Sequence, residues 1–131
     1  MPHITVDYSR NMQERVDITL LCDSLRRAAE ATGVFPLAGI RVRAFAADHV
    51  SLADGNPAHG YLDISVRLRA GRNNDTKQQV TQAIFAAAEA QLADAMEHHS
   101  IALSLELRDI DPDLSPKSGT IRKHLAKEAS Q

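Results

Sequence analysis

The sequence has no tryptophan and a single cysteine, Cys22, and only 4% of its 131 residues are aromatic. One cysteine cannot form an intrachain disulfide, and this sparing use of cysteine fits a reducing compartment, so we expect a cytoplasmic protein. With so few aromatic rings, the core has to be built from aliphatic side chains. The length is enough for one domain to bury such a core without metal or disulfide staples.

Several functional classes lack their sequence signals. No stretch approaches the ~18 apolar residues of a membrane helix, and no basic-then-apolar signal peptide opens the sequence. The formal net charge of -2 gives no footprint for nucleic acid. No glycine-rich phosphate loop, cysteine pair or nucleophile elbow occurs. The adjacent His98 and His99 would diverge by about 100° on a helix and could not easily share a metal. We therefore expect no membrane, nucleic-acid or metal partner.

Hydrophobic periodicity predicts the secondary structure. Alternating apolar and polar residues predict four strands, at residues 3–8, 40–46, 61–69 and 101–107. Apolar residues at helical spacing predict two helices, from about 13 or 17 to 32 and from about 76 to 98. Asp17 and Gly33 fit the two ends of the first helix, and Asp75 with Gln78 resembles a capping box before the second. The apolar stripe of the second helix repeats every fourth residue, at Val80, Ile84, Ala88, Leu92 and Met96.

The chain repeats one order of elements. Strand, helix and strand occur near residues 2–47 and again near 61–108, separated by the turn-rich excursion 48–60, which could hold a short strand near 50–52. Helices of this length between strands imply right-handed parallel crossovers. We expect a single α/β (α+β) domain, 1–131, with a four-stranded mixed sheet, both helices on one face and a C-terminal extension at 109–131. The other face should carry apolar groups covered by further copies of the chain.

Pro2 is the first candidate for chemistry. Proline tolerates the start of a chain for purely structural reasons, but loss of Met1 would leave Pro2 with a free secondary amine that can act as a base or nucleophile. A generic α-amino group titrates near ~8. One guanidinium roughly 7 Å away, at an effective dielectric of about 20, would disfavour the protonated amine by about 2.4 kcal/mol, roughly 1.7 pK units. Nearby arginines could therefore keep Pro2 neutral.

Three arginines are candidates for that role. Arg41 opens the second strand, and Arg43 follows it on the same face. Arg72 lies after the third strand and just before a helix, a junction where backbone N–H groups and the helix dipole favour anions. A single arginine in a strand or turn is more often solvated or salt-bridged. Together with Pro2, Arg41 and Arg72 suit proton abstraction next to an enol or carbonyl in a di- or tri-acid.

Weaker candidates surround these residues. His3 follows Pro2 and could line a pocket, or pack within its strand. Arg67 and Arg69 on the third strand could assist the other arginines. His49 and His59 lie in the excursion without a metal-ligand partner at useful spacing.

The residues that carry these candidates resemble a known family. Met1-Pro2-His3, the block 31–43, Ala53-Asp54-Gly55 and Ala70-Gly71-Arg72 are similar to the 5-carboxymethyl-2-hydroxymuconate delta-isomerases of the tautomerase superfamily. The similarity runs through nearly the whole chain and includes Leu103-Ser104. The middle block is the specific part, since Met-Pro alone is common. The resemblance implies a tautomerase-like fold and a cofactor-independent homotrimer with an amino-terminal proline at each site.

The resemblance also implies an activity. Pro2 would act as general base and convert 5-carboxymethyl-2-hydroxymuconate to 5-oxopent-3-ene-1,2,5-tricarboxylate in homoprotocatechuate catabolism. Arg41 and Arg72 match the family's arginines, and would bind substrate carboxylates and polarise the 2-keto oxygen. From their positions beside Arg41 and Pro2, rather than from the resemblance, we expect Arg43 and His3 to add substrate contacts. Two other functions fit the same residues: another proline-dependent tautomerase, dehalogenase or hydratase acting on a related carboxylate, and a non-catalytic trimeric binding protein.

Overall fold

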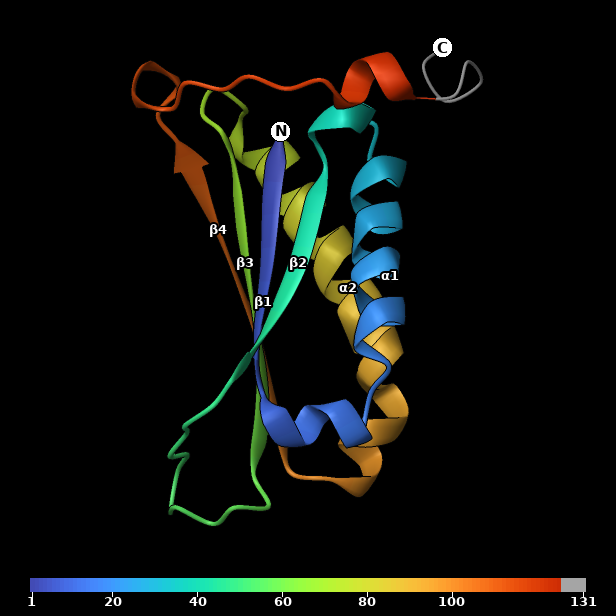
Figure 1. Ribbon diagram of the computed structural model, residues 1–131, viewed down its shortest axis with the longest axis vertical. Coiled ribbons are helices and arrows are strands. Elements are labelled where there is room, and N and C mark those ends of the chain that lie inside the picture. Colours follow the sequence, from blue (N-terminus) through green and yellow to red (C-terminus); the bar gives the residue numbers. More distant parts are fainter. Residues whose placement is uncertain (126–131) are drawn as a thin grey trace.

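Two strand–helix–strand units share one four-stranded sheet in the computed structural model (Figure 1). The structure describes residues 1–125. The first unit comprises β1 (Pro2–Ser9), α1 (Ile18–Ala31) and β2 (Arg41–Ala47), and the second comprises β3 (Gly60–Arg69), α2 (Asn74–His98) and β4 (Ile101–Ile110). Both helices cover the same face, so the predicted fold class is confirmed. Among residues 1–125, no helix has the length and apolar character required to cross a bilayer.

The pairing of the strands brings four chain segments to one edge. The strand order is β2-β1-β3-β4; β1 runs parallel to β2 and antiparallel to β3, and β3 runs parallel to β4. His3 consequently faces Arg41 on one side and Arg67 on the other. The starts of β1 and β2 therefore meet the ends of β3 and β4.

The core lies between the sheet and the helices. Ile4 and Val6 of β1 are fully buried, as are four alternate residues of β3 and the four residues of α2 that begin with Val80, namely Leu62, Ile64, Val66, Leu68, Val80, Ile84, Ala88 and Leu92. Met96 was wrongly assigned to this stripe: it is 41% exposed, and Ala95 is buried instead. Each four-residue step turns about 40° beyond one helical turn, so a spacing of four drifts off the core face within four steps.

The ends of the elements differ in detail from expectation. α1 begins after Asp17, whose side chain accepts from the Leu20 N–H, while residues 10–14 form a separate 3-10 turn. The N-cap of α2 is Asn73, whose side chain accepts from the Thr76 N–H at 2.9 Å, so the capping box at Asp75 was wrong. Asn73 is the residue immediately before the helix, and its side-chain oxygen accepts a hydrogen bond from a backbone N–H of the first turn, as asparagine commonly does at this position. No strand forms at residues 50–52.

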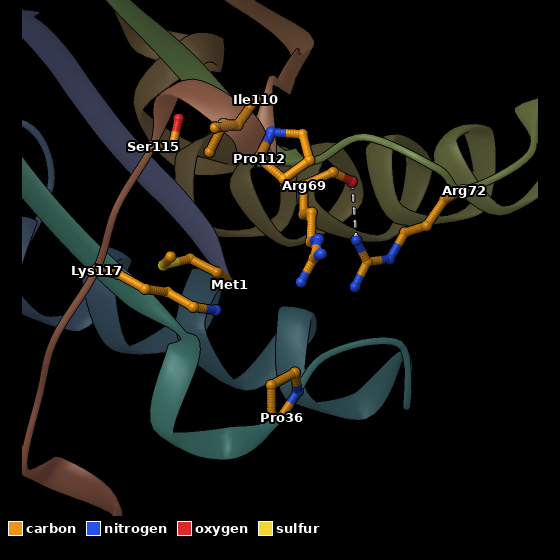
Figure 2. Close-up of a pocket in the computed structure, with 8 residues that line it drawn as sticks. All are labelled: Met1, Pro36, Arg69, Arg72, Ile110, Pro112, Ser115 and Lys117. Carbon is orange, nitrogen blue, oxygen red and sulfur yellow. Dashed lines mark hydrogen bonds between the residues drawn. The ribbon is translucent and has the colours of Figure 1, made fainter.

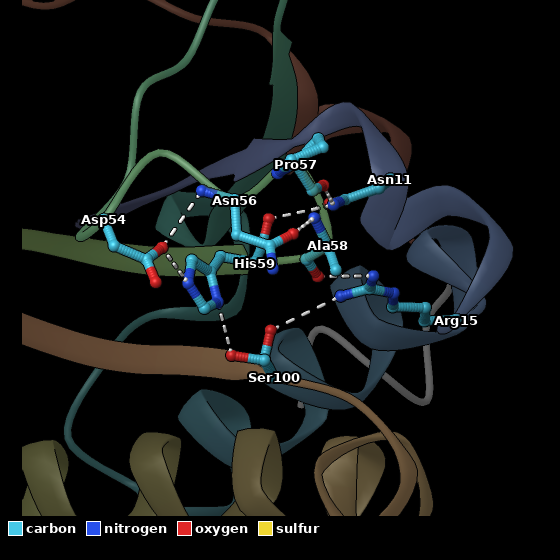
Figure 3. A network of polar contacts seen from close by, with 8 residues as sticks. All are labelled: Asn11, Arg15, Asp54, Asn56, Pro57, Ala58, His59 and Ser100. Carbon is cyan, nitrogen blue, oxygen red and sulfur yellow. Dashed lines mark hydrogen bonds and ion pairs between the residues drawn. The ribbon is translucent and has the colours of Figure 1, made fainter.

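The excursion is held at the sheet end opposite Pro2 (Figures 1 and 3). Asn11 donates to the His59 carbonyl at 2.9 Å, and Arg15 donates to the Ala58 carbonyl at 2.8 Å. The His59 ring bridges Asp54 and Ser100, at 2.7 Å to each. These contacts fix a segment that has little apolar surface to bury, which gives His59 a structural role.

The second face of the sheet is more polar than expected. It carries alternate residues of each strand, and several bond to one another: Tyr61 donates to Asp7 at 2.6 Å, and Ser104 donates to Asp63 at 2.6 Å. Within residues 1–125, Phe45, at 57% exposure, is the large hydrophobic side chain that this face leaves strongly exposed. The face therefore carries apolar groups among many polar ones, and its coverage by further copies of the chain in a trimer stays a prediction.

The cap of α2 offers a test of the fold. Replacing Asn73 with alanine (Asn73→Ala) removes the side-chain acceptor for the Thr76 N–H, so we expect a loss of about 1 kcal/mol in the free energy of unfolding. Urea denaturation at one fixed protein concentration measures it. The matched control is Gln78→Ala, expected to change stability by less than about 0.5 kcal/mol. A larger loss of stability in Gln78→Ala than in Asn73→Ala would instead support the capping box of Asp75 and Gln78.

Candidate active site

Strand pairing and burial fix the backbone of Pro2 at one edge of the sheet. It is buried at the start of a central strand, opposite Leu68 of β3, and the next residue pairs with both neighbouring strands. Met1 continues past the sheet edge into a hollowed region (Figure 2). The backbone at Pro2 is therefore held in place while the chain end projects into open space that a small molecule could occupy.

Three cavities meet at Met1, and we call them the Met1 cavities. One of about 240 Å³ includes Arg69 and Arg72, one of about 160 Å³ includes Arg41, and one of about 300 Å³ includes His3. Cationic side chains dominate their polar lining, namely Arg41, Arg67, Arg69, Arg72, Lys117 and Arg122. No aspartate or glutamate among residues 1–125 lines any of the three. Within residues 1–125, none of these six cations forms an ion pair.

Arg72 is held in place without being neutralised. Its guanidinium lies over the Phe35 ring, 5.1 Å from the centroid. It donates to the Arg69 carbonyl at 3.0 Å and to the Val34 carbonyl at 3.5 Å. A cation over an aromatic face is attracted by the ring quadrupole, and carbonyl acceptors carry no full charge. The guanidinium keeps its positive charge available for an anion. Sequence reasoning missed the support given by Phe35, although that residue lies in the block that carried the resemblance.

The other predicted residues separate into two groups. Arg41 lies beside His3 in the sheet and lines two of the Met1 cavities. Arg43 lies two residues farther along β2, opposite Thr5, and lines none of the three. The structure thus brings Pro2, Arg41, Arg72 and His3 to one edge and sets Arg43 farther along the polar face.

His3 is poised to remain uncharged. Burial lowers the pKa of its imidazole, and the positive charges of Arg67, Arg41, Arg43 and the amino terminus lower it further. Its Nδ1 atom is buried and has no hydrogen-bond partner within the described chain. A neutral imidazole can donate from one nitrogen and accept at the other, so His3 can bind a polar group in the cavity it lines.

The same positive field acts on the amino terminus. Burial, followed by the positive charges of Arg72, Lys117, Arg41 and Arg69, lowers the pKa of the Met1 amine from 8.0 to about 6. This amine belongs to Met1 and lies one residue beyond the Pro2 nitrogen, so it reports the electrostatic environment of this edge. An amine placed here is neutral near pH 7 and can accept a proton.

The C-terminal extension closes the site from above. After β4, the chain turns at Pro112–Leu114 and crosses the end of the sheet to a 3-10 turn at Ile121–His124 (Figure 1). It brings Lys117 to the Met1 cavities, a residue that sequence reasoning missed because the extension has no periodicity that could place it. Close packing continues beneath: a Cβ added to Gly39 would lie 3.0 Å from both the Cα and the nitrogen of Met1.

Comparisons with known proteins identify the family of this chain. Residues 2–125 match the family model for 5-carboxymethyl-2-hydroxymuconate isomerase. A protein of Escherichia coli named 5-carboxymethyl-2-hydroxymuconate Delta-isomerase is 33% identical over 121 residues, which cover 92% of this chain and 96% of that protein.

Solved structures extend the likeness to the fold. The crystal structure of a 5-carboxymethyl-2-hydroxymuconate isomerase from Deinococcus radiodurans R1 has a TM-score of 0.88 and 27% identity, covering 96% of this chain and 95% of its own. A fused 4-OT symmetric trimer has the same fold, with a TM-score of 0.69 and 21% identity over 88% of this chain and 93% of that one. As its residues predicted, the chain belongs to the 5-carboxymethyl-2-hydroxymuconate isomerase family.

Proposed function

We propose that this chain isomerises 5-carboxymethyl-2-hydroxymuconate to 5-oxopent-3-ene-1,2,5-tricarboxylate, in homoprotocatechuate catabolism, with Pro2 as the general base after loss of Met1. The observation that carries the proposal is the position of the chain end. It lies in cavities that, over the described part of the chain, are lined by six cations and no carboxylate, and burial and positive charge lower the pKa of an amine there. The family's substrate is a muconate with a carboxymethyl group, hence a tricarboxylate, whose charge such a lining complements.

The proton transfer follows from the two chemical names. The substrate is a 2-hydroxydiene, and the product has a ketone at that carbon and a new hydrogen at C5 of the muconate skeleton. The neutral Pro2 amine takes the proton of the 2-hydroxyl, electrons shift through the diene, and the resulting prolinium returns a proton to C5. The reaction moves one proton and two double bonds, and needs no cofactor.

The remaining residues bind and orient the substrate. Arg72, fixed over Phe35, presents its guanidinium to the 2-keto oxygen and the adjacent carboxylate, where negative charge develops in the transition state. Arg41 binds a second carboxylate from the other side of Pro2. Neutral His3 contributes a hydrogen bond, and Arg43 assists mainly by strengthening the positive field.

The proposal includes a cytoplasmic homotrimer that binds neither nucleic acid nor membrane. The trimer is supported by the symmetric trimer formed by fused 4-OT, which shares the fold, and by the sheet face that neither helix covers. A single domain over residues 1–131 agrees with this assembly.

Replacement of the base tests the mechanism. Intact mass should show that the purified protein lacks Met1. Pro2→Ala should lower kcat on the tricarboxylate about 10²- to 10⁴-fold, the range of general base catalysis, with circular dichroism and oligomeric state unchanged. A fully active alanine variant would remove proline from the mechanism. Faster turnover of other dienols or of halo-acrylates by the wild type would favour the sister activities, and retention of Met1 would favour a binding protein.

The pH profile tests the electrostatics. The base works only when unprotonated, so kcat/KM should fall as pH falls through the lowered amine pKa. The pKa of about 6 for the Met1 amine places this acidic limb well below the ~8 of an ordinary α-amino group. Among the neighbouring charges, that of Arg72 lowers the amine pKa most, so Arg72→Ala should raise this pKa and move the limb to higher pH. A limb near 8 or above in the wild type, or one unmoved in the variant, would contradict the cationic field.

The arginines should make comparable contributions. Arg41→Ala and Arg72→Ala each remove a charge-assisted hydrogen bond, and each should lower kcat/KM by about 1.5–3 kcal/mol, roughly 10- to 150-fold. Steady-state kinetics at a pH above the acidic limb measures this loss. Arg27→Ala, which removes an exposed α1 cation paired with Asp23, is the control and should leave kcat/KM unchanged. Wild-type kinetics in both site variants would reject the assignment.

A further inference from the structure

Lys117 holds a special position among the cations of the site. Among the cations of residues 1–125, it is the one that lines all three Met1 cavities, and the other five each line one or two. It lies on the exposed run between the two 3-10 turns of the C-terminal extension. Figure 2 shows its side chain lying alongside Met1, reaching in from the opposite side to Arg72.

Only two of the three substrate carboxylates have been assigned a binding residue so far. Arg41 and Arg72, which belong to the sheet and to the β3–α2 junction, account for two carboxylates. A tricarboxylate brings a third, on the carboxymethyl arm. A rotatable arm suits an ammonium on a flexible stem, which accepts many approach angles, whereas a planar guanidinium favours a rigid, bidentate partner. Lys117 has this chemistry and comes from a third direction.

The other cations fit the third carboxylate less well. The backbone carbonyl of Arg69 supports Arg72, and its side chain lines the same cavity as Arg72. Arg122 lines a single cavity, on the Arg41 side. Arg67 belongs to the strand opposite His3 and lines only the cavity that His3 lines. Each adds positive charge near a carboxylate already bound, and none spans the three cavities.

We propose that Lys117 binds the carboxylate of the carboxymethyl arm and thereby selects tricarboxylate over dicarboxylate 2-hydroxydienes. The inference rests on the proposed function and names the specificity residue of that site. The arm is attached to C5, the carbon that receives the proton. Holding the arm therefore orients C5 toward Pro2 as well as increasing affinity, and correct orientation of reacting atoms accelerates the chemical step.

Kinetics on two substrates test the proposal. Lys117→Ala should lower kcat/KM about 10- to 100-fold for the tricarboxylate and less than about 3-fold for 2-hydroxymuconate, which lacks the arm, the difference reflecting one charge-assisted contact. Both are measured well above the acidic limb, where the Pro2 amine is neutral in wild type and variant alike. Lys117→Arg should restore part of the preference. Lys123→Ala is the matched control, because Lys123 belongs to the same extension and lines none of the Met1 cavities.

A binding measurement separates this proposal from the proposed function. Calorimetry with propane-1,2,3-tricarboxylate and with glutarate, which lacks the middle carboxylate, should show a tricarboxylate preference in wild type that falls about tenfold or more in Lys117→Ala. An unchanged preference, or equal kinetic losses on both substrates, would overturn the role of Lys117. A wild type that prefers the tricarboxylate probe in a Lys117-dependent way but turns over neither dienol would instead overturn the isomerase and leave Lys117 as the receptor.

Discussion

Uncompensated positive charge at one edge of the sheet is the constraint on which this structure depends. Of the residues that the structure describes, six cations and no carboxylate line the Met1 cavities. Like charges repel, so the arrangement depends on a fixed backbone. Strand pairing holds Arg41, Arg67 and Arg69, and the Phe35 ring with two backbone carbonyls holds Arg72. Burial and this repulsion together lower the pKa of an amine placed among the cations, and the same positive charge attracts an anionic ligand.

The site is built where the two strand–helix–strand units meet. The first unit supplies Pro2 and Arg41, and the second supplies Arg69 and Arg72. Antiparallel pairing of β1 with β3 brings them together, since it sets the start of one strand beside the end of the other. Phe35, from the first unit, supports Arg72 of the second. Neither unit alone holds the complete set, so doubling the motif is what creates the candidate site.

Much of this arrangement could be predicted from sequence because it depends on short-range pattern. Alternation fixed which residues of β1 and β3 face the core, and the helix lengths required parallel crossovers, which bring Pro2 and Arg41 to one edge. Two kinds of feature could not be predicted: the rotation that accumulates along a helix, and the position of a segment that packs against residues distant in sequence. Met96 left the core through the accumulated turn of a fourfold repeat, and Lys117 was missed because its aperiodic segment gives no indication of where it folds back. The polarity of the second sheet face was underestimated, although the alternation of each strand already assigned polar residues to it.

The convergence of both ends of the described chain on one site has a practical consequence. Gly39 leaves no room beside Met1, and the extension that carries Lys117 crosses directly above. An affinity tag ahead of Pro2 would abolish the secondary amine and fill the cavities. A bulky fusion after the extension would displace the segment that carries Lys117. The excursion at the far end, pinned by Asn11 and Arg15, is the place where a fluorophore or purification handle leaves the chemistry undisturbed.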